Sequence, residues 1–358
     1  MRLNKLAKKI FAAGLAVSLM MANAGVSFAA DYQTVTGGTV TAKKTMTIEA
    51  DAKVPAVTYT YKVTALDNAA SQSGTVEDVT ISFSNADTIT DGKVVKDINL
   101  NFGTVTYKEP GVYSYEIEET QSAPAPTGLV NNNSTKRYAR VYVVDDSTDT
   151  AKKLKVQIVA LLTEEDKDLT DAEITDAKKT AGFDCEYKTF PLTFRKEVTG
   201  NQASRDKYFE FTVKLNNVAD GTKYTVDITN AEASPVANSA TTYSSMANPT
   251  ELTATANGVE QTFYLQHGQE ITIKGIGNGT GYTVTEKPED YTSSTALAKE
   301  GFTDATEGTV SKEIKTGYLN TKNGVIPTGV ILDSAPFILI IGLAAAALIF
   351  TAARKRVR

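Results

Sequence analysis

The chain contains very few of the residues on which enzymes and disulfide-linked secreted proteins depend. Its 358 residues include one cysteine, Cys185, and one histidine, His267. A single cysteine excludes a disulfide within the chain. His267 lies in the turn-like sequence Gln266-His267-Gly268 without a recognisable catalytic partner, and no metal-ligand cluster or phosphate-binding loop is present. The sequence therefore indicates no cofactor and disfavours an enzyme.

Clusters of positive charge are also scarce in the body of the chain. The formal net charge is -5, and most of the clustered basic residues lie close to the two ends. No basic stripe with interleaved aromatic residues remains between them, so we expect no binding to nucleic acid.

The N-terminus has the three parts of a secretory signal peptide. Lysines and an arginine precede an apolar stretch from Ile10 to Met21, and the small residues of Ser27-Phe28-Ala29-Ala30 follow. We expect cleavage after Ala29 or Ala30, which assigns 1–30 to the signal peptide. The alternative is a retained N-terminal anchor.

The C-terminus, 325–358, predicts a membrane segment with a basic tail. The apolar run from Ala335 to Ala353 is about 19 residues long, which as a helix just spans a hydrocarbon core of ~30 Å. The tail Arg354-Lys355-Arg356-Val357-Arg358 is expected to stay in the cytoplasm. One interpretation of this segment is an ordinary single-pass anchor.

A short motif outside the membrane favours a different interpretation. Ile326-Pro327-Thr328-Gly329 resembles the sorting signal of Gram-positive cell-wall proteins, which a sortase transpeptidase cleaves between Thr and Gly. The common signal has one residue between Pro and Thr, and the shorter form found here resembles that of certain pilus shaft proteins. The resemblance implies that the membrane holds only the precursor and that Thr328 becomes the new carboxyl end.

The body of the chain reads as β structure. Val, Ile, Thr and Tyr alternate in 58–63, 79–83, 140–144, 209–213 and 224–228, and turn residues such as Asp91-Gly92 and Asn278-Gly279 separate such runs. Many short strands of this spacing predict an all-β fold of two tandem immunoglobulin-like β-sandwich domains, 31–189 and 190–324. The charged segment 164–179 is expected to be a short helix or a solvated loop.

Each half of the chain places one lysine and one glutamate on the inward side of a strand. Lys44 shares its parity with apolar residues of 40–48, as Lys196 does with those of 192–198. Later in each half, aromatic strands end in Glu119 and Glu286 on the inward parity. We therefore expect two buried lysines and two buried carboxyl groups.

Two interpretations of these buried groups remain open. A buried lysine is costly unless it is paired or neutral, so the first interpretation is an ion pair, or a lysine that reaches the edge of its domain. The second uses Asn320, which follows an aromatic residue in Tyr318-Leu319-Asn320. Neutral Lys196 would attack the side-chain carbonyl of Asn320, and protonated Glu286 would polarise that carbonyl and shuttle protons. The product is an isopeptide bond between the first and last strands.

Taken together, the motifs resemble those of the major shaft pilins of Gram-positive bacteria, particularly the two-domain streptococcal backbone pilin. The similarity covers nearly the whole chain. The segments on which it rests are Lys44-Thr45-Met46, Pro110 to Glu119, Leu192 to Gly200, Tyr282 to Glu286, Tyr318-Leu319-Asn320 and Ile326 to Gly329. The resemblance implies isopeptide roles for Lys196, Glu286 and Asn320. In the first domain Lys44 and Glu119 match the family, but Cys185 takes the position of the asparagine.

A thiol cannot form an amide with lysine, so the sequence predicts that the first cross-link is absent. Asp184 is adjacent to Cys185 but points to the opposite face of a regular strand. Cys185 itself is expected to be a small buried core residue, with an oxidised lysine-cysteine bridge as the less favoured alternative.

The resemblance also implies the partners and the location. The sortase would link Thr328 of one subunit to Lys178, or to the adjacent Lys179, of the next, giving a head-to-tail filament. Identical subunits, other pilins and cell-wall peptidoglycan are the further expected partners, on the surface of a Gram-positive bacterium. The alternative function is a wall-anchored adhesin or minor pilus component that binds a host ligand.

Overall fold

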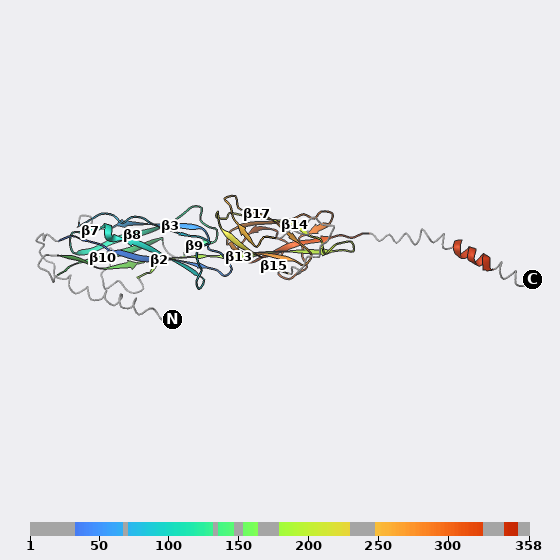
Figure 1. Ribbon diagram of the computed structural model, residues 1–358, viewed down its shortest axis with the longest axis horizontal. Coiled ribbons are helices and arrows are strands. Elements are labelled where there is room, and N and C mark those ends of the chain that lie inside the picture. Colours follow the sequence, from blue (N-terminus) through green and yellow to red (C-terminus); the bar gives the residue numbers. More distant parts are fainter. Residues whose placement is uncertain are drawn as a thin grey trace, which may run out of the picture.

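The computed structural model of the protein is almost entirely β, which confirms the predicted fold class. It describes residues 33–66, 71–131, 135–146, 153–163, 179–229, 248–324 and 340–349. Two β-sandwiches follow one another along the longest axis of the molecule (Figure 1). The expected signal peptide, the motif Ile326-Pro327-Thr328-Gly329 and Lys178 lie outside the described residues.

The first sandwich packs a five-stranded sheet against a four-stranded sheet. In spatial order the larger sheet holds β11 (Leu154–Leu162), β10 (Lys136–Asp145), β8 (Gly111–Gln121), β3 (Val57–Ala65) and β5 (Val79–Phe83). The smaller sheet holds β6 (Lys93–Asn101), β2 (Thr39–Ile48), β12 (Gly182–Tyr187) and β9 (Leu129–Asn131). A small third sheet joins β1 (Val35–Thr36), β7 (Thr106–Tyr107) and β4 (Gln72–Ser73), next to the 3-10 turn η3 (Phe102–Thr104).

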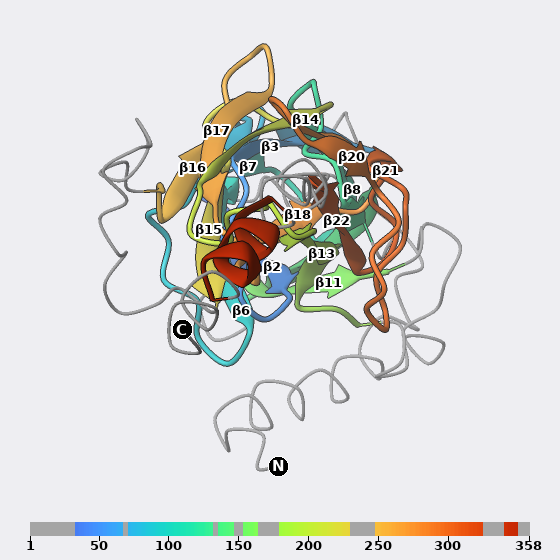
Figure 2. The same ribbon diagram turned by 90° about the vertical axis from the view of Figure 1, so that its right-hand side faces the viewer.

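The second sandwich packs a six-stranded sheet against a four-stranded sheet. The larger holds β16 (Glu251–Thr253), β15 (Lys223–Thr229), β18 (Glu270–Gly277), β13 (Thr189–Thr199), β22 (Ile314–Thr321) and β20 (Thr292–Ser294). The smaller holds β17 (Val259–Leu265), β14 (Phe209–Asn216), β19 (Gly281–Glu286) and β21 (Glu307–Thr309). Seen along the long axis, the sheet of β14 and β17 lies opposite the sheet of β13, β18 and β22 (Figure 2).

Alternation of side chains along each strand builds a separate apolar core in each sandwich. In β2 the inward positions from Ala42 to Ile48 are buried, while Thr39, Thr41 and Lys43 are exposed. One contiguous cluster runs from Ala42 to Tyr187 and a second from Leu192 to Val310. Because a single residue, Lys188, separates β12 from β13, we propose 31–189 and 190–324 as the domain limits.

The first and last strands of each sandwich are parallel neighbours. β12 pairs with β2, with Cys185 opposite Met46, and β22 pairs with β13, with Asn320 opposite Val198. Parallel strands cannot be joined by a tight hairpin, so the rest of each sandwich lies between the two paired strands in the sequence.

The C-terminal apolar segment is described only at 340–349, which is helical. Within the described parts of the chain, no helix has both the length and the apolar character needed to cross a bilayer.

Candidate functional site

The second sandwich brings Lys196, Glu286 and Asn320 together in its core. Lys196 Nζ lies 3.0 Å from Glu286 Oε1, and Asn320 Nδ2 donates a hydrogen bond to the same oxygen at 2.7 Å. The side chains of Lys196 and Glu286 are 0% exposed, as is Asn320. The predicted burial of this lysine is therefore confirmed, and a lysine reaching the domain edge is excluded.

The strand register explains why these three side chains meet. Lys196 and Val198 share the inward face of β13, and Asn320 lies opposite Val198 on the neighbouring parallel strand β22. Glu286 comes from the facing sheet, where it ends β19 opposite Phe211 of β14. The site thus joins the first and last strands across the core to a carboxyl group from the other sheet.

The surroundings of Lys196 favour its neutral form. Its Nζ lies 4.2 Å from the centroid of the Phe209 ring, inside an otherwise apolar core. Burial lowers the pKa of Lys196 from 10.5 to about 8, although the charge of Glu286 opposes this change. An amine with such a pKa is a usable nucleophile near neutral pH.

Asn320 and Glu286 each have an oxygen with little or no hydrogen bonding. Asn320 Oδ1 is buried and has no hydrogen-bond partner in the described part of the chain. Ser293 Oγ donates to Glu286 Oε2 at 3.4 Å, and Ser293 lies directly opposite Asn320 in the ladder between β20 and β22. A buried amide oxygen without a donor costs about 1 to 3 kcal/mol, so the described contacts leave the amide of Asn320 incompletely satisfied.

The first sandwich contains an equivalent cluster with one substitution. Lys44 Nζ lies 2.9 Å from Glu119 Oε1 and 4.2 Å from the centroid of the Tyr59 ring, and Lys44 is 0% exposed. Cys185 occupies the register position of Asn320, two residues after an aromatic residue on the last strand. The structure thus places the thiol where the resemblance implies an asparagine, and Asp184 is exposed on the other face as expected.

Two tyrosines complete the polar contacts of the first cluster. Tyr61 Oη donates to Glu119 Oε2 at 2.8 Å, and Tyr59 Oη donates to Cys185 Sγ at 3.6 Å. Burial, followed by the charge of Glu119, raises the pKa of Tyr61, so its hydroxyl stays protonated and remains a donor. Burial also raises the pKa of the Cys185 thiol, and the nearby Lys44 opposes that rise.

Sequence reasoning did not single out these tyrosines or their counterparts. Tyr59 and Tyr61 of β3 correspond to Phe209 and Phe211 of β14, because Tyr61 faces Glu119 and Phe211 faces Glu286 in the two ladders. The alternation in Tyr59-Thr60-Tyr61 predicts that both tyrosines point into the core. It does not predict which buried group each hydroxyl hydrogen-bonds.

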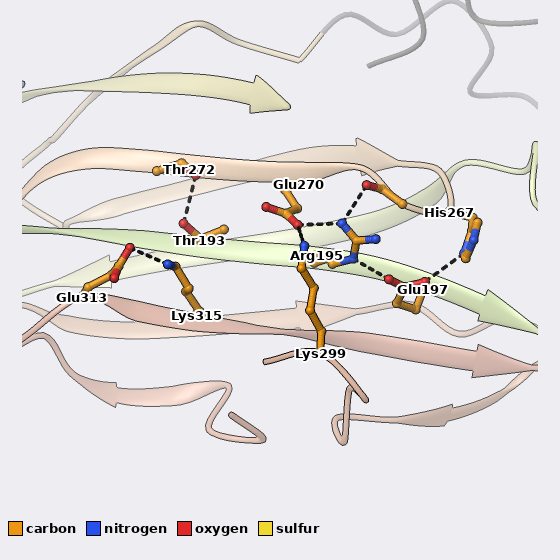
Figure 3. A network of polar contacts seen from close by, with 10 residues as sticks. Thr193, Arg195, Glu197, His267, Glu270, Thr272, Lys299, Glu313 and Lys315 are labelled. Carbon is orange, nitrogen blue, oxygen red and sulfur yellow. Dashed lines mark hydrogen bonds and ion pairs between the residues drawn. The ribbon is translucent and has the colours of Figure 1, made fainter. Parts of the chain in front are cut away.

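The opposite face of β13 carries a polar network rather than a reaction site. Arg195 Nη1 donates to Glu270 Oε1 at 2.6 Å and Arg195 also pairs with Glu197 (Figure 3). His267 Nδ1 accepts a hydrogen bond from the Val198 amide at 2.9 Å, and burial lowers the pKa of His267, which favours the neutral ring. This single histidine therefore accepts a backbone hydrogen bond near the C-terminal end of β13.

The expected acceptor lysines are only partly described. Lys179 is half-buried, and its backbone bridges Leu162 at the end of β11. It lies close in sequence to the start of β12, the strand that carries Cys185.

Comparisons with known proteins match both sandwiches. Residues 40–188 match the family model of the Spy0128-like isopeptide containing domain, and residues 191–322 match a domain of unknown function, DUF7601. A pilin from Streptococcus pyogenes serotype M1 is 25% identical, with 89% of this chain and 93% of the relative covered. The chain is similar to the Gram-positive shaft pilins.

Two further comparisons agree with that relationship. The crystal structure of the major pilin from Streptococcus pyogenes superposes with a TM-score of 0.51 at 18% identity, covering 81% of this chain and 100% of the other, which supports the shared fold. The pilus tip adhesin Cpa of Streptococcus pyogenes is 29% identical over 146 residues, which are 40% of this chain but only 18% of the adhesin. These findings support the predicted role as a structural subunit of a cell-surface pilus.

Proposed function

We propose that this chain is the repeating shaft subunit of a covalent pilus, and that its second sandwich closes itself with an isopeptide bond between Lys196 and Asn320. The observation that carries the second part is the three-way contact of Lys196, Glu286 and Asn320, whose side chains are all buried in the core. Polymer formation rests on the motif at Thr328 and Gly329 and on the relationship to pilins.

The bond requires one internal proton transfer before the chemistry. Lys196 and Glu286 share one proton at 3.0 Å, and in a core of low polarity the neutral amine and neutral acid become accessible beside the ion pair. Protonated Glu286 is then a donor on the oxygen that Asn320 contacts.

Rotation of the asparagine amide supplies the matching acceptor. The two ends of an amide are similar in shape, and turning the group by half a turn places Oδ1, now without a partner, against the acid proton of Glu286. That hydrogen bond polarises the carbonyl and satisfies the buried oxygen at the same time.

The reaction then balances without a cofactor. Lys196 Nζ forms a bond to Asn320 Cγ as Glu286 passes its proton to the carbonyl oxygen. The carboxylate then takes a proton from the attacking nitrogen and gives it to Nδ2, the Cγ–Nδ2 bond breaks, and the proton on the oxygen returns to Glu286. One ammonia leaves for each bond formed, and Glu286 ends in its starting state. Close packing supplies the orientation, because all three groups are fixed by strand register.

The equivalent cluster of the first sandwich has no leaving group. Cys185 has no carbonyl, so Lys44 and Glu119 remain an ion pair with a tyrosine hydroxyl on the second carboxylate oxygen. We propose that this sandwich is held without a Lys-Asn bond.

Polymerisation is proposed as sortase chemistry at the C-terminal motif. The enzyme would cleave between Thr328 and Gly329 and transfer the threonyl group to Lys178 or Lys179 of the next subunit. The other proposed partners are identical subunits, other pilins including a tip adhesin, and peptidoglycan at the pilus base. The membrane is proposed to hold the precursor only.

The decisive experiment is the intact mass of the ectodomain, residues 31–328. A loss of about 17 Da, one ammonia, that is absent in Asn320→Ala is the expected result. An unshifted wild-type mass would leave Lys196 as an ion-pair partner. For polymerisation, the shaft role predicts a ladder of SDS-resistant multimers on the cells. The alternative role as an adhesin, which the partial match to the tip adhesin Cpa supports, predicts a single anchored species.

A further inference from the structure

The chain leaves the second sandwich through a clamp of hydrogen bonds. Beyond β22, Lys322 N donates to Thr199 O at 3.0 Å and Gln202 N donates to Lys322 O at 3.1 Å. The side chain of Asn201 then pairs with both polar backbone groups of Gly324, at 3.0 Å to its carbonyl oxygen and 2.7 Å from its amide.

Local sequence makes this clamp possible. Gly200 has a φ of 110°, and a Cβ there would lie 2.2 Å from Lys322 O, so only glycine allows the two strands to approach so closely. The backbone is therefore held against the sandwich as far as Gly324.

A cluster of paired charges surrounds this exit, and we call it the exit face, formed by Asn201, Lys207, Glu289, Asp290 and Lys322. Lys322 Nζ contacts Asp290, and Lys207 Nζ contacts Glu289. Both ammonium groups also lie over the ring of Tyr291, at 5.3 and 5.4 Å from its centroid. The side chain of Asp290 is 61% exposed, so the cluster presents charge to solvent in a fixed arrangement.

Chain length brings this face close to any enzyme that acts at Thr328. Only four residues, 325–328, separate Gly324 from the expected point of cleavage, and four residues reach at most ~14 Å. An enzyme domain of about 150 residues has a radius of gyration of ~15 Å, so its surface cannot hold Thr328 in a groove without meeting the end of the sandwich.

We infer that the exit face is a docking surface for the transpeptidase that cleaves at Thr328, which reads the folded end of the sandwich together with the motif. The inference rests on the proposed sorting reaction. It assigns the partner a surface of mixed charge complementary to the two lysine-carboxylate pairs.

The test uses the full chain with an epitope tag after Arg358, expressed in the cells that produce it, because cleavage removes the tag. One variant, the charge reversal, replaces the two lysines of the exit face by glutamate, with Lys207→Glu and Lys322→Glu. A second variant, the insertion, adds six Gly/Ser residues after Gly324 and leaves the exit face intact. The matched control is Lys214→Glu with Lys223→Glu, an exposed and a half-buried lysine paired with Glu260 and Glu251.

Both the reversal and the insertion are expected to slow tag loss about tenfold, the control to leave it unchanged, and the combination to add nothing further, since each removes the same contact. Unchanged tag loss in both variants would overturn the inference. Normal tag loss with fewer multimers would also overturn it, in favour of a contact between subunits. A wild-type tag that is retained as fully as in Thr328→Ala would instead reject the sorting reaction itself.

Discussion

Removal of the asparagine side chain is the sharpest test of the second sandwich. Asn320→Ala prevents bond formation and leaves Lys196 and Glu286 in place. The bond would close a loop of about 125 residues, and the chain-entropy relation gives such a loop about 5 kcal/mol of stability. With an unfolding entropy of ~2.1 cal/mol/K per residue for a domain of about 130 residues, this loss lowers Tm by roughly 18 °C.

The assay combines intact mass with calorimetry on the same samples. The wild-type ectodomain is expected to lack about 17 Da and to show a high-melting transition, while Asn320→Ala regains the mass and melts lower. Cys185→Ala is the matched control, because it changes the equivalent position of the first sandwich and is expected to leave the mass deficit intact. A variant that regains the mass but keeps its melting temperature would refute the loop-entropy reasoning, and a wild-type chain of full mass would refute the bond.

Three other predictions address the two clusters. Cys185→Asn supplies the missing leaving group beside Lys44, so the total mass deficit is expected to double to about 34 Da; a second deficit that fails to appear would show that the first cluster cannot react. Burial lowers the pKa of Lys196 to about 8 in the fold against 10.5 when unfolded, and Asn320→Ala keeps this amine free, so the unfolded variant is expected to bind more protons between these values. Stability of that variant measured by urea should therefore be level below pH 8 and rise from pH 8 to 10.5, and a fall over that window would contradict the assignment. When the wild-type ectodomain is pulled from its two ends, only the first sandwich should extend, by ~50 nm for about 150 residues, whereas Asn320→Ala should add a second event of similar size.

Much of the fold was readable from the sequence because period-two alternation is strong in these strands. The segment 79–83 was predicted as a strand and is β5, and 224–228 lies within β15. The inward parity of Lys44 and Lys196 followed from their apolar neighbours, and both are fully buried. The face of a strand on which a residue lies depends only on alternation within that strand, so it can be predicted without knowing the partner strands.

The geometry of the site could not be predicted from the sequence, because it depends on the pairing of strands that are far apart in the chain. That Asn320 lies opposite Val198, and Cys185 opposite Met46, depends on parallel registers between strands more than 120 residues apart in the sequence. Hydrophobic patterning fixes which face a residue occupies but not which residue of another strand it meets. For the same reason, the hydroxyl of Tyr61 on Glu119 and that of Ser293 on Glu286 could not be inferred from the sequence.

The difference between the two clusters follows from how each satisfies its buried polar groups. In the first, Lys44 and Tyr61 occupy the two oxygens of Glu119, and Tyr59 donates to the thiol, so every group has a partner without a covalent bond. In the second, phenylalanines replace both tyrosines, which removes two hydroxyl donors from the core.

Asn320 is left with a buried oxygen that has no described donor, beside an amine whose pKa burial has lowered. Unsatisfied polar groups in a core of low polarity are costly. Under the proposed reaction, conversion of the amine and the amide to a secondary amide removes the separated charges of the ion pair and leaves a single N–H donor to be satisfied. We therefore propose that the aromatic residues without hydroxyls favour the bond-forming reaction in the second cluster, whereas the tyrosines stabilise the first cluster as an ion pair.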